Sequence, residues 1–199
     1  MKILKSALLA SWIIGLTSGC SENLPVDKGA NATGHTAPSA STVKANMAVL
    51  DKRPFANRND FDYARRGLIA QDENYHTKNA EGETLFRAKD FNFIDKNGNN
   101  APPSVNPSLW RQAKLNAIHG LFKVTDGIYQ LRGYDLSNMT VIEGDTGWII
   151  VDPGTSKESA ARGLAFARKH LGDKPVTGII FTHSHGDHFG GALGVLTAE

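Results

Sequence analysis

Residues 182–191 read THSHGDHFGG. Within six of these residues the stretch carries four side chains that can bind a metal ion: His183, His185, Asp187 and His188. His183 and His185 point to the same side of an extended backbone because side chains alternate, so their imidazoles can converge on one cation. Gly186 lets the loop turn back, which would bring Asp187 and His188 to a second cation. The stretch therefore predicts half of the protein ligands of two neighbouring metal ions.

The segments around this stretch fit a metal site. The continuous apolar run at 176–182 predicts a strand that is covered on both faces. The pair Gly190-Gly191 would let the next helix begin close to the site, where side chains would obstruct it. A histidine-rich surface loop that binds metal by chance is the alternative, and the ordered spacing after a buried strand argues against it. The other histidines are interpreted as surface or locally packed residues: His35, His76, His119 and His170.

Strands and one helix alternate before the metal-binding stretch. Four apolar runs separated by Asp-Gly and Gly-Asp turns predict strands at 121–124, 128–131, 139–143 and 148–151. Residues 144–147 read GDTG and predict a hairpin between the last two. An amphipathic helix is expected to begin at Thr155-Ser156 and to end at Gly172. Strand, hairpin, helix and strand in this order indicate an α/β layered fold.

Asp152 follows the predicted strand at 148–151 and precedes Pro153-Gly154. A carboxylate at a strand end beside a metal loop can hold a ligand imidazole or backbone amides in place. An aspartate that only forms a turn before Pro-Gly is the alternative. The sequence leaves both interpretations open.

Three further elements are predicted before residue 121. They are, in chain order, a short helix within 55–70 that is capped by Asn59 or Asp60 and ends near Gly67 or shortly after, an extended segment over 84–95, and a helix from Asn106-Pro107 to a capping Gly120.

The first 19 residues have the layout of a secretory signal peptide. Their apolar run is about half of the roughly 20 residues that a membrane-spanning helix needs. Residues 16–20 read LTSGC and resemble a bacterial lipobox, whose cysteine, here Cys20, is lipidated. Secretion without a lipid is one alternative, and a buried apolar helix is another. Residues 20–46 predict a flexible tether, so a domain at 47–199 is expected outside the cytoplasm, in the periplasm or on the outer membrane.

The composition is that of an ordinary globular protein and narrows the kinds of site. The chain has 199 residues, 40% of them hydrophobic and 21% charged, which fits one domain. Its formal net charge is +2, and cleavage of a leader with Lys2 and Lys5 would leave it neutral, so no nucleic-acid partner is implied. The single cysteine excludes an internal disulfide, a Cys-based zinc cluster and a CxxC redox pair. Any metal must therefore be held by histidines and carboxylates.

The stretch HSHGDH at 183–188 is the metal motif of the metallo-β-lactamase superfamily. Three further stretches resemble the secreted alkyl sulfatases, the SDS-hydrolase branch of that superfamily: residues 60–70 (DFDYARRGLIA), residues 106–122, and residues 134–140 (YDLSNMT). The resemblance extends from about residue 50 to the end of the chain.

The resemblance implies an αββα fold with two zinc ions, His183 and His185 on the first ion and Asp187 and His188 on the second. It also implies that a hydroxide held by both ions hydrolyses alkyl sulfate esters to alcohol and sulfate. Arg65 and Arg66 could face the anionic head group, or could form an ion pair at a helix end. A homodimer is expected for the family, and contact with a membrane only through a lipid at Cys20.

Members of this family continue well past residue 199 with further metal ligands. The chain is therefore expected to hold the first half of the sandwich only and to expose apolar surface on the strand at 176–182 that the remaining layers would cover. In isolation it is expected to bind metal weakly and to turn over little substrate. Two alternatives remain from the sequence: another hydrolase of this fold, such as a lactamase or a thioesterase, and a non-catalytic fragment that binds metal or a membrane surface.

Overall fold

The computed structural model describes residue 31 and residues 34–96 and 100–196. The chain divides into two compact units, Met1–Ala37 and Pro38–Glu199. The predicted signal peptide, the lipobox with Cys20, and residues 20–30 and 32–33 of the predicted tether lie outside the described residues. Within the described ranges, no helix combines the length and the apolar character that a membrane span needs.

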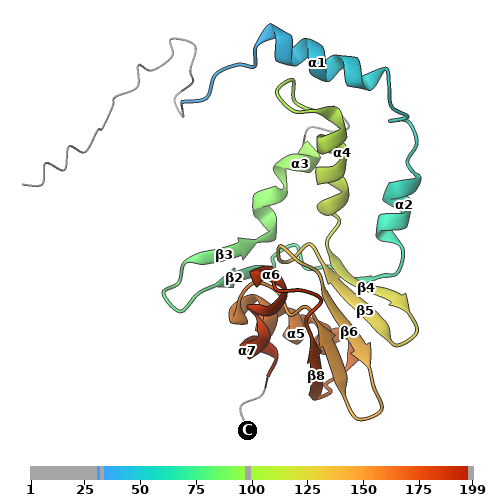
Figure 1. Cartoon of the computed structure of the whole chain (residues 1–199), viewed down its shortest axis with the longest axis vertical. Helices are drawn as coiled ribbons and strands as arrows, with labels where there is room; N and C mark the ends of the chain where they lie inside the picture. The colour runs from blue at the N-terminus through green and yellow to red at the C-terminus, as the bar shows by residue number, and fades with distance from the viewer. Residues whose placement is uncertain (1–30, 32–33, 97–99, 197–199) are drawn as a thin grey trace, which may run out of the picture. The chain divides into compact units, whose positions relative to one another are not determined.

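A six-stranded sheet in the order β1-β4-β5-β6-β7-β8 forms the body of the second unit (Figure 1). Its strands are β1 (Leu68–Ala70), β4 (Gly120–Thr125), β5 (Ile128–Arg132), β6 (Met139–Glu143), β7 (Trp148–Val151) and β8 (Val176–Ile180). Neighbours pair in antiparallel fashion except β7 and β8, which are parallel. The predicted strands at 121–124, 128–131, 139–143 and 148–151 are confirmed. Short apolar runs separated by glycine turns favour strands that pair with their neighbours in the chain.

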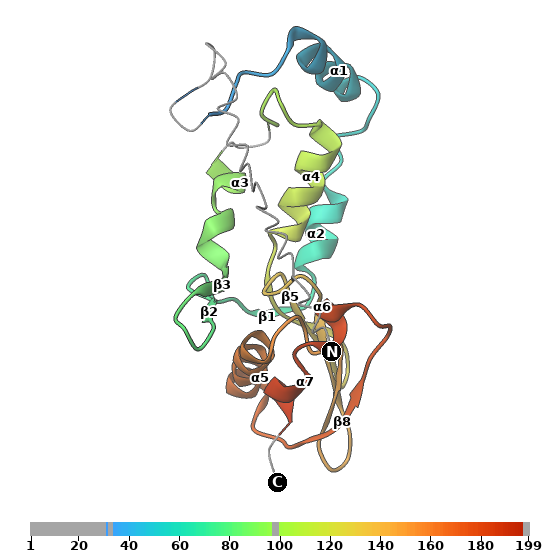
Figure 2. The ribbon, with the colours of Figure 1, turned by 60° about the vertical axis from the view of Figure 1, so that its left-hand side comes forward.

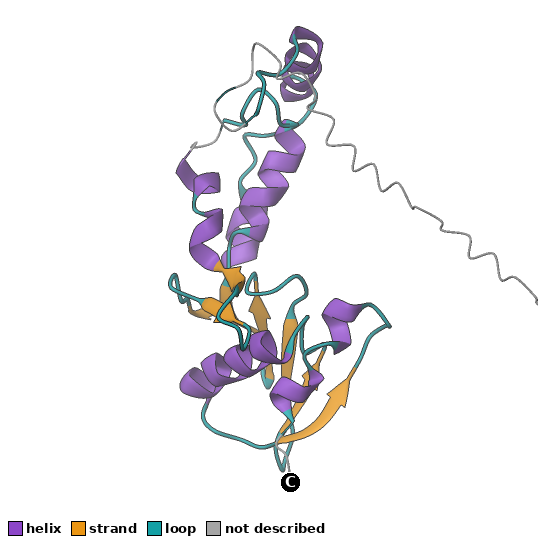
Figure 3. Ribbon diagram, turned by 90° about the vertical axis from the view of Figure 1, so that its left-hand side faces the viewer, coloured by secondary structure: helices purple, strands orange, loops and turns teal. Residues whose placement is uncertain are grey.

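Helix α5 (Lys157–Leu171) makes the crossover from β7 to β8 and builds the core. Ser156 caps its first turn by accepting a hydrogen bond from the backbone N–H of Ser159, and Gly172 ends it at a φ of 95°. Helix α5 and the short helix α7 (Ala192–Val195) lie side by side against the sheet (Figures 2 and 3). Between them and the sheet lies a cluster of buried side chains that includes Val141, Trp148, Ile150, Leu164, Ala167 and Val195.

Strand β8 differs from its prediction. It ends at Ile180 instead of residue 182 and is the edge strand of the sheet. The side chains of Ile180 and Phe181 are 49% and 48% exposed, which confirms the expectation that this apolar run exposes surface when only half of the sandwich is present. A second large sheet is absent from the ranges that the structure describes, which agrees with the expected half sandwich.

The region before β4 holds the remaining elements. They are α1 (Ala40–Leu50), α2 (Asn59–Arg65), β2 (His76–Lys78), β3 (Thr84–Arg87), the 3-10 helix η1 (Ala88–Phe91), α3 (Phe93–Lys96) and α4 (Pro107–Asn116). The predicted helix at Asn106-Pro107 is confirmed, since the Asn106 side chain accepts from the N–H of Ser108 and Pro107 occupies the first turn.

Four sequence predictions in this region are wrong at their boundaries. The tether does not reach residue 46, because Ser39 caps α1 and Asn46 donates to the carbonyl of Pro103 beside α4. The first helix begins at Asn59 after Arg58, which makes no side-chain cap, and it ends at Arg65, before the predicted end near Gly67. Residues from Leu68 pair with β4 as β1. The extended segment over 84–95 keeps strand geometry only to Arg87. Gly120 caps no helix but begins β4, because α4 already ends at Asn116.

Candidate metal centre

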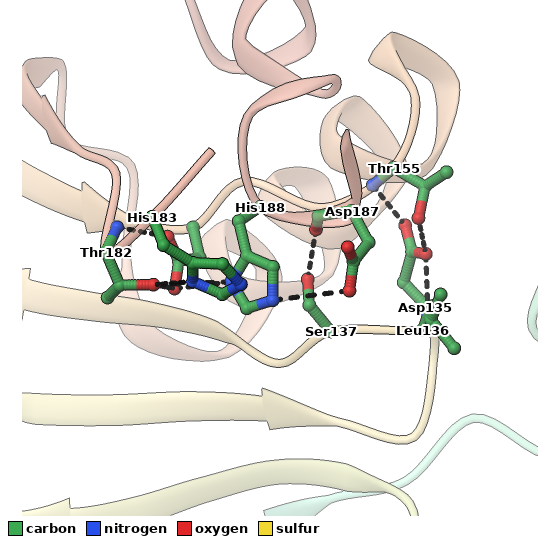
Figure 4. Close-up of polar contacts among 9 residues, drawn as sticks. Asp135, Leu136, Ser137, Thr155, Thr182, His183, Asp187 and His188 are labelled. Atoms are coloured by element: carbon green, nitrogen blue, oxygen red, sulfur yellow. Dashed lines mark hydrogen bonds and ion pairs between the residues drawn. The ribbon is translucent and has the colours of Figure 1, made fainter. Parts of the chain in front are cut away.

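The four predicted ligands lie on one loop at the end of β8, as Figure 4 shows for three of them. His183 and His185 precede the four-residue helix α6 (Gly186–Phe189), and Asp187 and His188 lie within it. The ring centroid of His183 is 4.6 Å from that of His185 and 3.9 Å from that of His188. The fold thus brings His183 close to both other imidazoles, and its approach to His185 is the one that the alternation of side chains predicts.

Asp152 anchors this loop from the end of β7. Its carboxylate accepts hydrogen bonds from the backbone N–H of Thr182 at 2.8 Å and from the Thr182 hydroxyl at 2.7 Å. Oδ2, the oxygen that accepts from the Thr182 hydroxyl, also lies 2.8 Å from Nδ1 of His188. Asp152 is 6% exposed and has a φ of 53°, an uncommon backbone conformation for a residue other than glycine. These contacts favour the interpretation that Asp152 orients a ligand imidazole over the alternative that it only forms a turn.

Asp152 is held in its charged form. Burial raises the pKa of its carboxyl group, but the hydrogen bonds from Thr182 and His188 outweigh this effect, so the pKa lies below its ordinary value. A carboxylate only accepts hydrogen bonds, and therefore Nδ1 of His188 carries the proton of the contact. In the neutral ring, Nε2 of His188 then presents a lone pair.

The lone pair of His188 faces a second electron-pair donor. Its Nε2 lies 3.2 Å from the Oδ2 oxygen of Asp187, and the two atoms attract each other only through a proton or a cation between them. The hydroxyl of Thr182 donates its single hydrogen to Asp152, so it accepts from Nδ1 of His183 at 3.0 Å and leaves Nε2 of that ring as a lone pair. These lone pairs and carboxylate oxygens fit a divalent metal ion such as zinc.

The loop supplies only part of each ligand shell. Among the residues that the structure describes, no group of three or more histidine, cysteine, aspartate or glutamate side chains is arranged to hold a metal ion. The ligand roles of His183, His185, Asp187 and His188 stay predictions.

The paired glycines after the loop permit its close packing. A Cβ on Gly190 would lie 2.3 Å from the carbonyl oxygen of Thr155, and a Cβ on Gly191 2.4 Å from that of Pro153. The N–H of Gly191 donates to the carbonyl of Gly154 at 2.9 Å. Any side chain at these positions would separate the metal loop from the turn that carries Asp152, so the expected reason for the glycine pair is confirmed.

The contacts of the arginines and the other histidines are local. Arg65 donates to the carbonyl of Phe61 within its own helix, and the Arg66 guanidinium lies 4.8 Å from the ring centroid of Tyr63. Neither contact supports a role toward an anionic head group. The three other histidines of the second unit contact nearby residues as predicted: His76 with Thr84, His119 with Ala117 and Tyr134, and His170 with Phe166.

Two residues at the site were missed by the reasoning from residue chemistry. The Ser137 hydroxyl donates to the backbone carbonyl of Asp187, and the Asp135 carboxylate accepts from the N–H and the hydroxyl of Thr155 at 3.0 and 2.5 Å (Figure 4). Both lie in the YDLSNMT stretch, which carries no metal-binding pattern. The resemblance of that stretch to alkyl sulfatases was the only available signal.

Comparison with known proteins identifies a family for the segment that contains this loop. The metallo-beta-lactamase superfamily matches residues 132–199, which include the loop, Asp152 and Ser137. Residues 132–199 of the chain are a metallo-beta-lactamase superfamily segment. Within this superfamily the chain is homologous to alkyl sulfatases: a linear primary-alkylsulfatase of Pseudomonas sp. is 47% identical over 156 residues, and an alkyl/aryl-sulfatase of Saccharomyces cerevisiae is 45% identical over the same length.

A solved structure of an alkyl sulfatase is similar to this chain as well. The stereoselective inverting sec-alkylsulfatase Pisa1 of Pseudomonas sp. matches with a TM-score of 0.74 and 45% identity, over 80% of this chain and 25% of its own. The two sequence relatives are matched over 78% of this chain but only 23% and 24% of their own lengths. The chain therefore spans about a quarter of these alkyl sulfatases, and its partial metallo-beta-lactamase fold agrees with the half sandwich expected from the sequence.

Proposed function

We propose that the protein carrying this chain hydrolyses alkyl sulfate esters to alcohol and sulfate with two zinc ions. The observation that carries the proposal is the ordered set His183, His185, Asp187 and His188, held by a buried carboxylate, in a chain about 45% identical to alkyl sulfatases. Zinc, when bound, lowers the pKa of water toward neutrality and neutralises the negative charge that develops on a departing sulfate.

The residues of the chain have distinct tasks in this proposal. His183 and His185 hold the first ion, and Asp187 and His188 hold the second. Asp152 keeps the proton of His188 on Nδ1, which leaves Nε2 of that ring free for metal. Thr182 does the same for His183 through its hydroxyl. These two contacts orient the rings so that Nε2 can face a metal ion, which lowers the cost of binding.

The test is sulfate release by the full-length, zinc-loaded protein. We expect hydrolysis of dodecyl sulfate, loss of the activity with a chelator, and no hydrolysis of a β-lactam or a thioester under the same conditions. Hydrolysis of either control substrate without sulfate release would show that the scaffold serves a different hydrolase.

We propose on sequence grounds that the protein is exported and anchored to a membrane through a lipid on Cys20. We expect Cys20→Ser to move the protein from the membrane fraction to the soluble fraction, because the lipid would be its only anchor. The measurement is an immunoblot of fractionated cells, with Ser21→Ala as the matched control. Equal membrane association of the Cys20→Ser variant would contradict the anchor.

A homodimer, also proposed from the family, would appear in the molar mass of the full-length protein.

A further inference from the structure

Three loops meet at the predicted metal centre, and each is bonded to the other two. They are residues 133–138 between β5 and β6, residues 152–156 between β7 and α5, and residues 181–191 after β8. Thr182 and Gly191 tie the third loop to the second through Asp152 and Gly154. The first loop forms hydrogen bonds to both of the others, to the second through Asp135 and to the third through Ser137.

The bond from Ser137 satisfies a backbone group that the local helix leaves open. The regular helical partner for the Asp187 carbonyl would be the N–H of Gly191, four residues later. That N–H donates to Gly154 instead, at 2.9 Å. The hydroxyl of Ser137, whose residue is 9% exposed, donates to the Asp187 carbonyl in its place. A buried hydroxyl from a distant loop thus fixes the backbone of a predicted metal ligand.

Helix α6 depends on such outside contacts. It has four residues, no side-chain hydrogen bond at its N-cap and no buried residue. A single helical turn is unstable by itself in water. Asp135 gives Ser137 its own support: its carboxylate accepts from Thr155, and from the N–H of Leu136 at 2.6 Å, which fixes the turn just before Ser137. The backbone of α6 at Asp187 is therefore held from the β5–β6 loop.

We propose that Ser137 and Asp135 are positioning residues that hold Asp187 in place for the second metal ion, an inference that rests on the proposed function. Ser137 acts through the carbonyl of Asp187, and Asp135 acts through the turn that carries Ser137. Neither residue is a metal ligand in this proposal.

The test compares Ser137→Ala and Asp135→Asn with wild-type full-length protein. Without the hydroxyl the Asp187 carbonyl loses its donor, so we expect faster amide hydrogen exchange at residues 186–190 of the metal-free protein. We expect the affinity of the weaker zinc site, measured by chelator competition, to fall about tenfold. For dodecyl sulfate, kcat should fall while KM changes little. Ser108→Ala, which removes an exposed hydroxyl on α4, is the matched control and should change none of these values.

The outcomes separate this inference from the proposed function. Wild-type hydrogen exchange and wild-type zinc affinity in both variants would overturn the positioning role, even if the protein hydrolyses alkyl sulfates. Faster exchange and weaker zinc binding in a protein that releases no sulfate would support the positioning role and remove the proposed substrate. A lower thermal midpoint with unchanged zinc affinity would mean that the two residues serve the fold alone, and would also overturn the proposal.

Discussion

His185→Ala and Asp187→Ala in the full-length protein are each expected to abolish alkyl sulfate hydrolysis, with a loss of about 10³-fold or more in kcat/KM. Each residue is one of two ligands that the loop would supply to its ion, so each variant leaves that ion a single ligand from this loop. Neither residue belongs to the hydrophobic core. The thermal midpoint of the metal-free protein should therefore stay close to that of the wild type.

Activity and zinc content of the purified variants are the measurements. His170→Ala is the matched control, because it removes an exposed imidazole that contacts Phe166 on α5 and lies outside the metal loop. It should retain wild-type activity and a full complement of zinc. Turnover at the wild-type rate in either His185→Ala or Asp187→Ala would contradict the ligand role given to that residue.

Asp152→Ala is expected to destabilise the protein by about 2–4 kcal/mol. The change leaves the Thr182 N–H and Nδ1 of His188 without their acceptor, and it places alanine at a φ of 53°. Asp152→Asn separates the two effects, since asparagine tolerates this backbone conformation and keeps an oxygen for Thr182. We expect the asparagine variant to fold with a smaller loss of stability and to bind zinc about 10–100-fold more weakly, because the negative charge beside His188 is gone.

Denaturant unfolding of the metal-free protein and chelator competition for zinc distinguish these variants. Asp126→Asn removes a carboxylate that is paired with Lys123 on the surface, and it should change neither property. Zinc binding of wild-type strength in Asp152→Asn would show that the carboxylate serves the fold and does not orient His188.

Local patterns explain how much of the fold was predictable. The strands from β4 to β7 and helix α5 have short turns and caps in the sequence itself, such as the GDTG hairpin and the Ser156 cap, so their positions follow from neighbouring residues. Strand β1 was not predicted, because its pairing with β4 joins residues more than 50 positions apart, as in Leu68 with Phe122. An apolar run does not by itself reveal which neighbours cover it, so the exposure at Ile180 followed only from the expected half sandwich.

The amino-acid sequence alone predicts the candidate ligands and the kind of metal they would bind, since imidazole and carboxylate at close positions of one loop are a local property. Tertiary structure alone decided what holds those ligands. Asp152 reaches Thr182 and His188 only because β7 and β8 are parallel and end at the same edge of the sheet. Ser137 reaches Asp187 only because the β5–β6 loop lies at that edge too. Contacts of this kind join residues 30 to 50 positions apart, and their geometry exists only after the strands have paired.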